Sequence, residues 1–261
     1  MIPEVYIREW GQHVSWREIV QIEHDLVLSR ALVALYNTDL IANTLVFRGG
    51  TALNKFYLKP PARYSEDLDF VQLKPAPIGD TIDVLKEVLS PWLGKPKWKS
   101  TERSIKMVFR YQSSDLMPIR LKIEINTTEH FKVKPLQTIP FQVINGWYEG
   151  KANVSLYSLE ELIATKVRAL HQRRKVRDLF DIWYVANHLN IDFQDVALIL
   201  KQYCNNDGIT ISQADFINTL SKKREHHDFR NDMAALLPRD QGWHFDEAYR
   251  FVIEEVIPCL H

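Results

Sequence analysis

Asp67 and Asp69 lie two positions apart in a stretch whose β-branched and aromatic residues predict a strand. Because side chains alternate along a strand, the two carboxylates are expected on one face and Leu68 and Phe70 on the other. Two carboxylates at that separation repel each other, and a divalent cation offsets the repulsion most naturally. Magnesium suits this role because it binds carboxylate oxygens together with substrate phosphates. The alternative is a solvated strand edge whose acids pair with nearby arginine or lysine residues.

Glu124 is a third candidate metal ligand. It lies in the strand-like run IRLKIEIN, in which apolar residues alternate with polar ones. If this strand lies beside the strand of the two aspartates, Glu124 completes a site for two metal ions. In such a site one ion lowers the pKa of an attacking hydroxyl and the other holds a triphosphate. The alternative for Glu124 is an exposed strand residue.

A double glycine, Gly49-Gly50, precedes Thr51 where a helix is predicted to begin. Glycines let the backbone approach a ligand closely, and the N–H groups of a first helical turn form an anion site. These residues are therefore candidates for binding a phosphate, with Thr51 either capping the helix or contacting the phosphate. The alternative is a tight turn between strand and helix.

Lys166 lies within the apolar stripe of a helix predicted over residues 158–173. A lysine there is costly unless its ammonium finds an acceptor or extends outward. The functional interpretation is a point-charge contact with a triphosphate oxygen, and the alternative is an ammonium that extends to solvent. On the next predicted helix, Asp178 and Asp181 are three positions apart and share one side.

A basic run joins these two helices. From Lys166 to Arg177 the chain has six lysines and arginines and no acidic residue. The formal net charge of the whole chain is zero, so attraction of a polyanion must depend on such a local patch. The candidates for contacts with RNA phosphates are Arg173, Arg174, Lys175 and Arg177. The alternative is a solvated turn in which Asp178 pairs with a neighbouring arginine.

Composition restricts the class of protein. The chain has 261 residues, 46% hydrophobic and 25% charged, which is enough apolar material for one large or two modest domains. Cys204 and Cys259 have no CxxC spacing, which suits a reducing compartment. No run approaches the ~20 apolar residues of a membrane span, and the first residues lack the apolar core of a signal peptide. We expect a cytoplasmic protein with no membrane partner.

Strands precede helices along the chain. A long first helix is expected from Ser15, which with Glu18 has the spacing of a capping box. Strands are expected near residues 44–48, 67–73, 104–112, 119–126 and 140–145, with a helix over 78–93. From Ser158 onward nearly every segment has helical periodicity. This order predicts an α+β half packed on a helical half, with a boundary near residues 150–157.

Motifs in this order resemble those of the nucleotidyltransferase toxins of the AbiEii and MenT type, members of the DNA polymerase β-like superfamily. They are RGGTALNKFY with RYSEDLDF, then KIEIN, then ELIATKVRAL with KVRDLFDIW. The resemblance covers about Leu45 to Trp183. It implies a nucleotidyltransferase core with a mixed sheet over residues 1–154, followed by a helical domain over residues 155–261 that closes the nucleotide cleft.

The resemblance also implies roles for individual residues. The residues that match the family's catalytic groups are Asp67, Asp69, Lys166 and Asp178. Nucleotide binding is implied for Gly49, Gly50, Thr51, Lys166 and Asp181. Magnesium is the implied cofactor, bound by Asp67 and Asp69, with Glu124 on the strand where many superfamily members place a third acid.

Members of this family act in type IV toxin–antitoxin and phage-defence systems, where some add nucleotides to the acceptor end of tRNA. The resemblance therefore implies transfer of NMP from an NTP to RNA, expected to be the 3′ end of tRNA, and a separately encoded antitoxin repressor. One alternative keeps this chemistry but modifies a small molecule or a protein hydroxyl. Another is a non-catalytic module that binds nucleotide or a partner. The basic run favours a polyanionic acceptor, and the retained aspartates, glycines and lysine favour an enzyme.

Overall fold

The computed structural model of the chain describes residues 2–238 and 241–260. The chain divides into two compact units. The first, here called the sheet unit, comprises Met1–His130 and Leu136–Tyr157. The second, the helical unit, comprises Phe131–Pro135 and Ser158–His261. None of the helices in the described ranges is long and apolar enough to cross a membrane.

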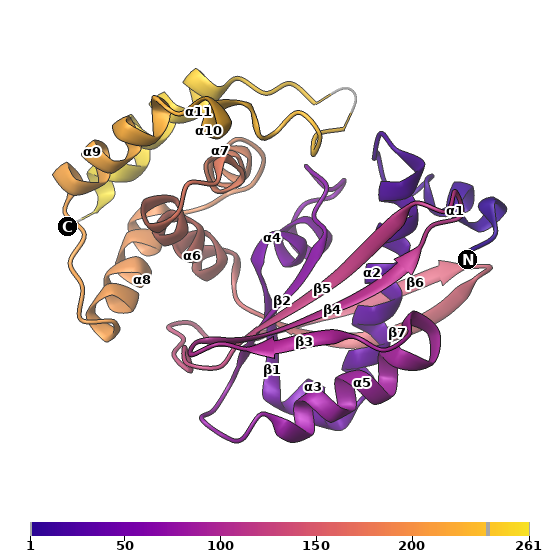
Figure 1. The fold of residues 1–261 in the computed structure, drawn as a ribbon. Helices are drawn as coiled ribbons and strands as arrows, with labels where there is room; N and C mark the ends of the chain where they lie inside the picture. The colour runs from indigo at the N-terminus through magenta and orange to yellow at the C-terminus, as the bar shows by residue number, and fades with distance from the viewer. Residues whose placement is uncertain (1, 239–240, 261) are drawn as a thin grey trace. The chain divides into compact units, whose positions relative to one another are not determined.

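The sheet unit is built on a mixed sheet of seven strands in the order β3-β4-β5-β2-β1-β7-β6 (Figure 1). The strands are β1 (Leu45–Arg48), β2 (Asp67–Gln72), β3 (Lys97–Ser100), β4 (Ser104–Gln112), β5 (Pro118–Asn126), β6 (Gln137–Asn145) and β7 (Tyr148–Leu156). The pairs β2–β5 and β1–β7 are parallel, and the other neighbouring pairs are antiparallel. Together with the helices that follow, this sheet confirms the predicted α+β class.

Six helical segments belong to the sheet unit. They are α1 (Glu4–Trp10), α2 (Ile19–Tyr36), α3 (Asp39–Thr44), α4 (Gly49–Ala52), the π-helix η1 (Leu53–Tyr57) and α5 (Gly79–Leu93). The prediction that Ser15 caps the long helix is wrong, because α2 begins at Ile19 with Glu18 as its N-cap. The Glu18 side chain accepts from the N3 backbone, and the Gln21 side chain accepts from the Glu18 N–H at 3.3 Å.

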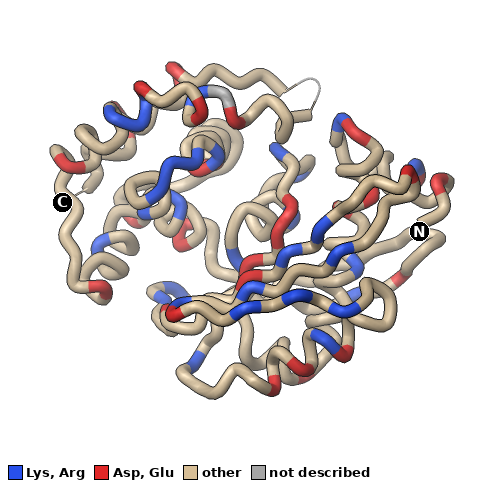
Figure 2. The backbone as a smooth tube through the Cα atoms, viewed as in Figure 1, with Lys and Arg blue, Asp and Glu red and all other residues tan. Residues whose placement is uncertain are grey.

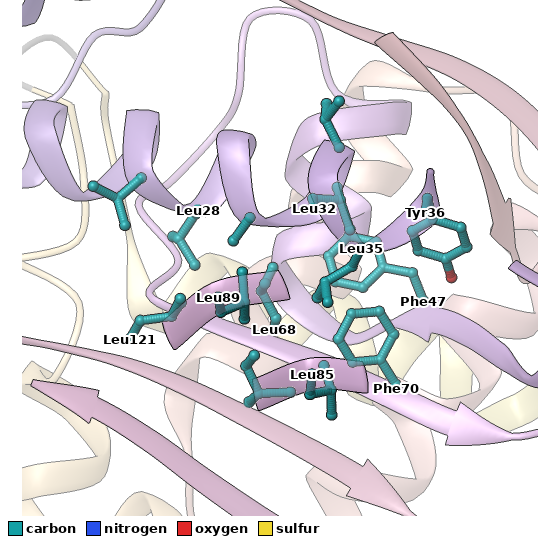
Figure 3. Close-up of a cluster of buried hydrophobic side chains, with 14 of the residues drawn as sticks. Leu28, Leu32, Leu35, Tyr36, Phe47, Leu68, Phe70, Leu85, Leu89 and Leu121 are labelled. Carbon is teal, nitrogen blue, oxygen red and sulfur yellow. The ribbon is translucent and has the colours of Figure 1, made fainter. Parts of the chain in front are cut away.

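The apolar face of the sheet fixes the register of β2. Leu68 and Phe70 are buried on this face, where leucines of α2 and α5 pack against them (Figure 3). Burying each such side chain contributes ~1.5–3 kcal/mol. A shift of β2 by one residue would expose both side chains and bury Asp67 and Asp69 instead. The core therefore directs the two aspartates to the opposite face of the sheet.

A buried ion pair anchors η1 to α2. The Lys55 ammonium donates to both carboxylate oxygens of Asp25, at 2.9 and 3.0 Å, and to Ser29 Oγ at 2.9 Å. The indole N–H of Trp10 donates to the same Asp25 carboxylate at 2.9 Å. Because the buried charges are paired and hydrogen-bonded, this network costs little and holds the helical turns that follow β1 in one place.

The helical unit contains α6 (Leu159–Gln172), α7 (Val176–His188), α8 (Phe193–Asn206), α9 (Gln213–Arg224), α10 (His227–Asn231), α11 (Phe245–Phe251), η2 (Val252–Val256) and η3 (Ile257–Cys259). Ser158 caps α6 by accepting from the Glu161 N–H at 3.2 Å. The buried Glu161 carboxylate accepts from the backbone N–H groups of Val133 and Lys134 and from the Tyr203 hydroxyl. These bonds tie residues 131–135 to the helical unit.

Candidate active site

The three predicted metal ligands share one face of the sheet. Strand β2 pairs in parallel with β5, and the register places Asp69 opposite Glu124 and Asp67 opposite Lys122. Residues that face each other across two strands project from the same face. The condition set for Glu124, that its strand lies beside that of the aspartates, is therefore met. All three acids are half-buried.

Asp69 carries a charge that its surroundings disfavour. Burial raises the pKa of its carboxyl, and the neighbouring Asp67 carboxylate raises that pKa further; Lys122 and Arg48 only partly oppose these two effects. Within residues 2–238 and 241–260, the Asp69 carboxylate has no hydrogen bond or ion pair. An uncompensated carboxylate beside a second one is the donor set that a divalent cation stabilises.

Lys122 is the local counter-ion of the other two acids. Its ammonium lies 3.1 Å from Asp67 Oδ2 and 3.2 Å from Glu124 Oε2. Burial lowers the pKa of Lys122, but Asp67 and Glu124 more than offset that effect, so the pKa lies above its ordinary value. Lysine thus neutralises part of the negative charge of the acidic cluster.

Glu124 is held by three donors. In addition to Lys122, Lys106 Nζ lies 3.1 Å from Glu124 Oε1, and Ser104 Oγ donates to the same oxygen at 3.2 Å. Burial raises the pKa of Glu124, but the two lysines outweigh burial and bring that pKa below its ordinary value. Across the described part of the chain, no three His, Cys, Asp or Glu side chains form a ready-made metal site. Because its oxygens already accept from three donors, Glu124 is less available to a metal ion than Asp69, whose carboxylate has no bonded partner in the described residues.

Gly49 makes room for Asp69. Its φ is +82°, a left-handed conformation that favours glycine, and a Cβ at this position would lie 2.5 Å from Asp69 Oδ2. Gly50 has a similar role toward Arg63, whose guanidinium would collide with a Cβ there. The Asn54 side chain donates to the Gly50 carbonyl and accepts from the Arg63 N–H. The double glycine lets the turn after β1 lie directly against β2.

Thr51 does not cap the helix, because α4 begins at Gly49 and its N-cap residue is Arg48. Its side chain is buried, and its hydroxyl donates to the Asp67 carbonyl oxygen at 2.6 Å. The hydroxyl also lies 2.8 Å from Ser65 Oγ. Thr51 thus links α4 to β2, and only its backbone N–H is left to meet the predicted phosphate.

Lys166 lies in a buried cluster of charges within the helical unit. Its ammonium lies 3.1 Å from Asp178 Oδ1 and 2.8 Å from Asp181 Oδ2, and only 5% of the residue is exposed. The alternative of an ammonium extending to solvent is therefore wrong. Burial raises the pKa of Asp178, but Lys166 and Arg173 reverse the shift and lower the pKa to about 2.

The four predicted RNA-binding residues differ in their surroundings. Arg173 forms a bidentate pair with Asp178, with N–O distances of 2.8 and 3.0 Å, as the alternative interpretation of the basic run expects. Arg174 and Lys175 are exposed, and Arg177 is half-buried. Lys175 Nζ lies 3.9 Å from a carboxylate oxygen of Asp232. Arg173 is exposed as well, but its guanidinium is already bound to the buried Asp178, so Arg174 and Lys175 are the exposed cations of the four that do not serve a buried carboxylate.

Sequence reasoning missed three basic residues that shape these clusters. Strand alternation alone puts Lys122 on the face of Glu124, but its pairing with Asp67 depends on the register of β2 and β5. Arg48, directly before the glycines, faces Asp69 across β1–β2 and bonds Glu129 at 2.8 Å. Lys223 donates to three carbonyls at the end of α6, those of Leu170, His171 and Arg173. No local signal in the sequence indicates these contacts of Lys223.

A mixed sheet that carries paired aspartates beside a glycine turn, followed by helices, defines a nucleotidyltransferase-type fold. Solved structures share this fold. The nucleotidyltransferase toxin MenT4 from Mycobacterium tuberculosis matches with a TM-score of 0.72 at 20% identity, covering 100% of this chain and 91% of that one. JHP933 from Helicobacter pylori matches with a TM-score of 0.56 at 22% identity, covering 94% of this chain and 93% of that one.

Residues 30–250 match the family described as nucleotidyl transferase AbiEii toxin of type IV toxin–antitoxin systems. The chain belongs to this family. A comparison with curated proteins finds no match. The predicted family and the predicted enzyme class are thereby confirmed, and membership implies a nucleotide substrate and a cognate antitoxin.

Proposed function

We propose that the protein is a magnesium-dependent toxin that transfers NMP from an NTP to an RNA acceptor, expected to be the 3′ end of tRNA, in a toxin–antitoxin or phage-defence system. The observation that carries the proposal is the carboxylate of Asp69. This carboxylate lies beside that of Asp67, its pKa is raised, and it has no bonded partner in the described residues. The backbone turn at Gly49 lies directly against it, because glycine has no side chain there.

Asp67 and Asp69 would hold the metal ion. A magnesium ion bound there supplies charge stabilisation for the triphosphate and lowers the pKa of the acceptor hydroxyl. Its binding would relieve the repulsion that raises the pKa of Asp69. Lys122 would then have to share or give up its contact with Asp67. Glu124 stays a candidate third ligand, and labelling of RNA by Glu124→Gln tests this role.

The nucleotide would be bound by groups from several elements. The backbone N–H groups of Gly49, Gly50 and Thr51 begin a helical segment and would face phosphate. Lys166 would contact a triphosphate oxygen, but only by sharing its ammonium with Asp178 or Asp181. These contacts are supported by the resemblance of the motifs and by the charges of the groups.

Accessible cations of the helical unit support a polyanionic acceptor. Arg174 and Lys175 are exposed, whereas Arg173 already neutralises Asp178. Phosphate contacts of this kind position RNA without reading its sequence. The informative variant is therefore Arg174→Gln with Lys175→Gln, because replacing Arg173 would also leave the buried Asp178 with one counter-ion fewer.

The test is an incubation of the purified protein with Mg²⁺, each labelled NTP in turn and total RNA, followed by gel separation. Labelling of one RNA size class that Asp69→Asn abolishes supports the proposal. Asp115→Asn, which replaces an exposed aspartate, is the matched control and should label RNA like the parent. Label on a small molecule or on protein, with none on RNA, would favour the other acceptors, and no label with any NTP would favour a non-catalytic module.

A further inference from the structure

A second basic surface lies on the sheet, on the face opposite the apolar core. We call it the basic sheet face, and its residues are Lys97, Lys99, Lys106, Arg110, Arg120 and Lys122. They alternate with core residues such as Met107, Phe109 and Leu121, which point to the other side. Figure 2 shows lysines and arginines recurring along β3, β4 and β5. These strands belong to the sheet unit, whereas the basic run between Lys166 and Arg177 belongs to the helical unit.

Cross-strand pairing on this face brings like charges together. The register places Lys99 opposite Lys106 across β3–β4, and Arg110 opposite Arg120 across β4–β5. Like charges directly opposite each other on neighbouring strands destabilise a sheet. Lys106 is compensated by Glu124, so the repulsion that a bound polyanion would relieve is strongest between Arg110 and Arg120.

The usual structural explanation covers only part of the surface. Lysines on an edge strand prevent sheets from associating edge to edge, which accounts for Lys97 and Lys99 on the edge strand β3. Arg110 and Arg120 lie where β4 and β5 extend beyond these neighbours, because β3 pairs with β4 only as far as Val108 and β2 pairs with β5 only from Lys122. Edge protection accounts for a cation on either strand there, but not for two like charges placed directly opposite each other. Their charges need another explanation.

Most of these cations are available to a ligand. Lys97, Lys99, Arg110 and Arg120 are exposed, and none has an ion pair within the described ranges. The two cations nearest the aspartates, Lys106 and Lys122, are the ones paired with Glu124 and Asp67. Positive charge thus continues from the outer strand to the acids on β2.

We propose that the basic sheet face binds the phosphate backbone of the RNA acceptor and leads its 3′ end to Asp67 and Asp69. This inference rests on the proposed transfer to RNA and names the surface that holds the substrate. Backbone contacts by lysine and arginine position a strand without reading its bases. Arg110 and Arg120 are the contacts that stability alone does not explain.

The first test measures binding of a fluorescent 20-nucleotide single-stranded RNA of mixed sequence, by anisotropy at several KCl concentrations, without NTP. Arg110→Gln with Arg120→Gln should weaken binding roughly tenfold at low salt. It should also flatten the slope of log affinity against log salt by about 1.4, since each contact contributes about 0.7. Lys74→Gln with Lys151→Gln removes two exposed lysines elsewhere in the same unit and should leave both quantities unchanged.

A second variant separates binding from structure. Arg120→Glu converts the repulsive pair with Arg110 into an attractive one and should raise the thermal midpoint by about 1–3 °C. The same change should weaken RNA binding more than Arg120→Gln does. Increased stability with unchanged RNA affinity would show a merely solvated face and overturn the inference.

The remaining outcomes are also decisive. If the double glutamine variant binds RNA like the parent but loses affinity for poly-glutamate, the face fits an acidic protein and the inference is wrong. Because this RNA binding is measured without NTP, it does not depend on catalysis. RNA binding that requires Arg110 and Arg120 in a protein that labels no RNA would support the surface while removing the proposed transfer reaction.

Discussion

Ionisation of Asp69 lowers the stability of the folded protein, because its carboxylate is buried beside a second one. Its pKa is raised in the folded protein, so the unfolded chain ionises first as pH increases. Stability contributed by the neutral carboxyl is therefore lost as pH rises from the ordinary aspartate pKa of about 4 through the raised value. At neutral pH the ionised Asp69 destabilises the fold unless a cation compensates it.

Replacing Asp69 by asparagine should therefore preserve or raise the thermal midpoint at pH 7 while abolishing nucleotide transfer. Mg²⁺ should raise the midpoint of the parent protein through binding to the folded state, and that increase should be absent in Asp69→Asn. Differential scanning calorimetry with and without Mg²⁺ measures both effects. A midpoint that collapses in the variant would instead assign Asp69 a structural role.

Lys166→Met should be strongly destabilising. The substitution leaves Asp178 and Asp181, both fully buried, with one counter-ion fewer, and breaking such a pair costs about 3–5 kcal/mol. Urea unfolding of the variant gives the loss, with Lys201→Met, an exposed lysine of the same unit, as the control. Adding Asp181→Asn to Lys166→Met should restore part of the stability. Equal stability of Lys166→Met and the control would contradict the buried ion pair.

Asp178 should govern acid sensitivity of the helical unit. Its pKa is about 2, below the ordinary value, because Lys166 and Arg173 outweigh burial. The stability that its ionised form contributes is present above the unfolded pKa of about 4 and is lost as pH falls through about 2. Asp178→Asn should flatten the dependence of unfolding free energy on pH between those values. A slope equal to that of the parent would show that other acids control this range.

Much of the site was visible at residue level, but its pairings were not. The sequence indicates Asp67, Asp69 and Glu124 as carboxylates on strand faces, and it indicates Lys166 as a lysine within an apolar stripe. It does not indicate that Lys122 lies between two of the acids, because that contact depends on the register of strands more than forty residues apart. It likewise does not indicate that Lys166 contacts Asp178 and Asp181, since the packing of α6 on α7 decides this.

The turn between β1 and α4 depends on the absence of a side chain at Gly49. Gly49→Ala adds a methyl group that overlaps the Asp69 carboxylate and also strains a left-handed backbone. Gly94→Ala is the matched control, because Gly94 has a φ of +79° but nothing within 4 Å of the added Cβ. The control should cost only the strain, about 1 kcal/mol. Gly49→Ala should cost more and lose the stabilisation by Mg²⁺, as thermal unfolding would show; equal costs would remove the contact with Asp69 from the explanation.

Elements with clear alternation were predicted closely. Strand β4 has the predicted bounds, and β5 differs by one residue at its start, because buried and exposed side chains alternate in both. Strand β3 was missed since all four of its residues are exposed, and β7 was missed since its polar and small residues give weak strand propensity. These two strands are held by their neighbours rather than by a pattern of their own.

Two compact units with different charge patterns make up the whole molecule. The net charge is zero and the isoelectric point is about 7.1, although the basic sheet face and the basic run are locally positive. A protein without net charge lacks the long-range repulsion that keeps molecules apart. Solubility in low-salt buffer should therefore pass through a minimum near pH 7 and increase with added salt or RNA. Light scattering between pH 5 and 9 measures this, and a flat profile would contradict it.

At this scale the order of strands and helices indicates the fold class and a boundary near residues 150–157, but not that a segment between two strands belongs with the helices. The structure divides the chain after Tyr157 and assigns Phe131–Pro135, which lie between two strands, to the helical unit. The Glu161 carboxylate makes that connection through backbone N–H groups. Hydrogen bonds between the buried Glu161 and the backbone of residues 133 and 134 depend on the folded arrangement and produce no periodic pattern in the sequence.

The order of the strands also has a consequence for biosynthesis. Strand β1, which leads into the glycine turn, lies between β2 and β7, and β7 is completed only at Leu156. At about 5–20 residues per second, a ribosome takes on the order of ten seconds or more to reach that point. Until then β1 has one unpaired edge, and the Lys166 cluster has not been synthesised. The growing chain thus cannot enclose the strand before the glycine turn between both of its neighbours until more than half of the protein has been translated.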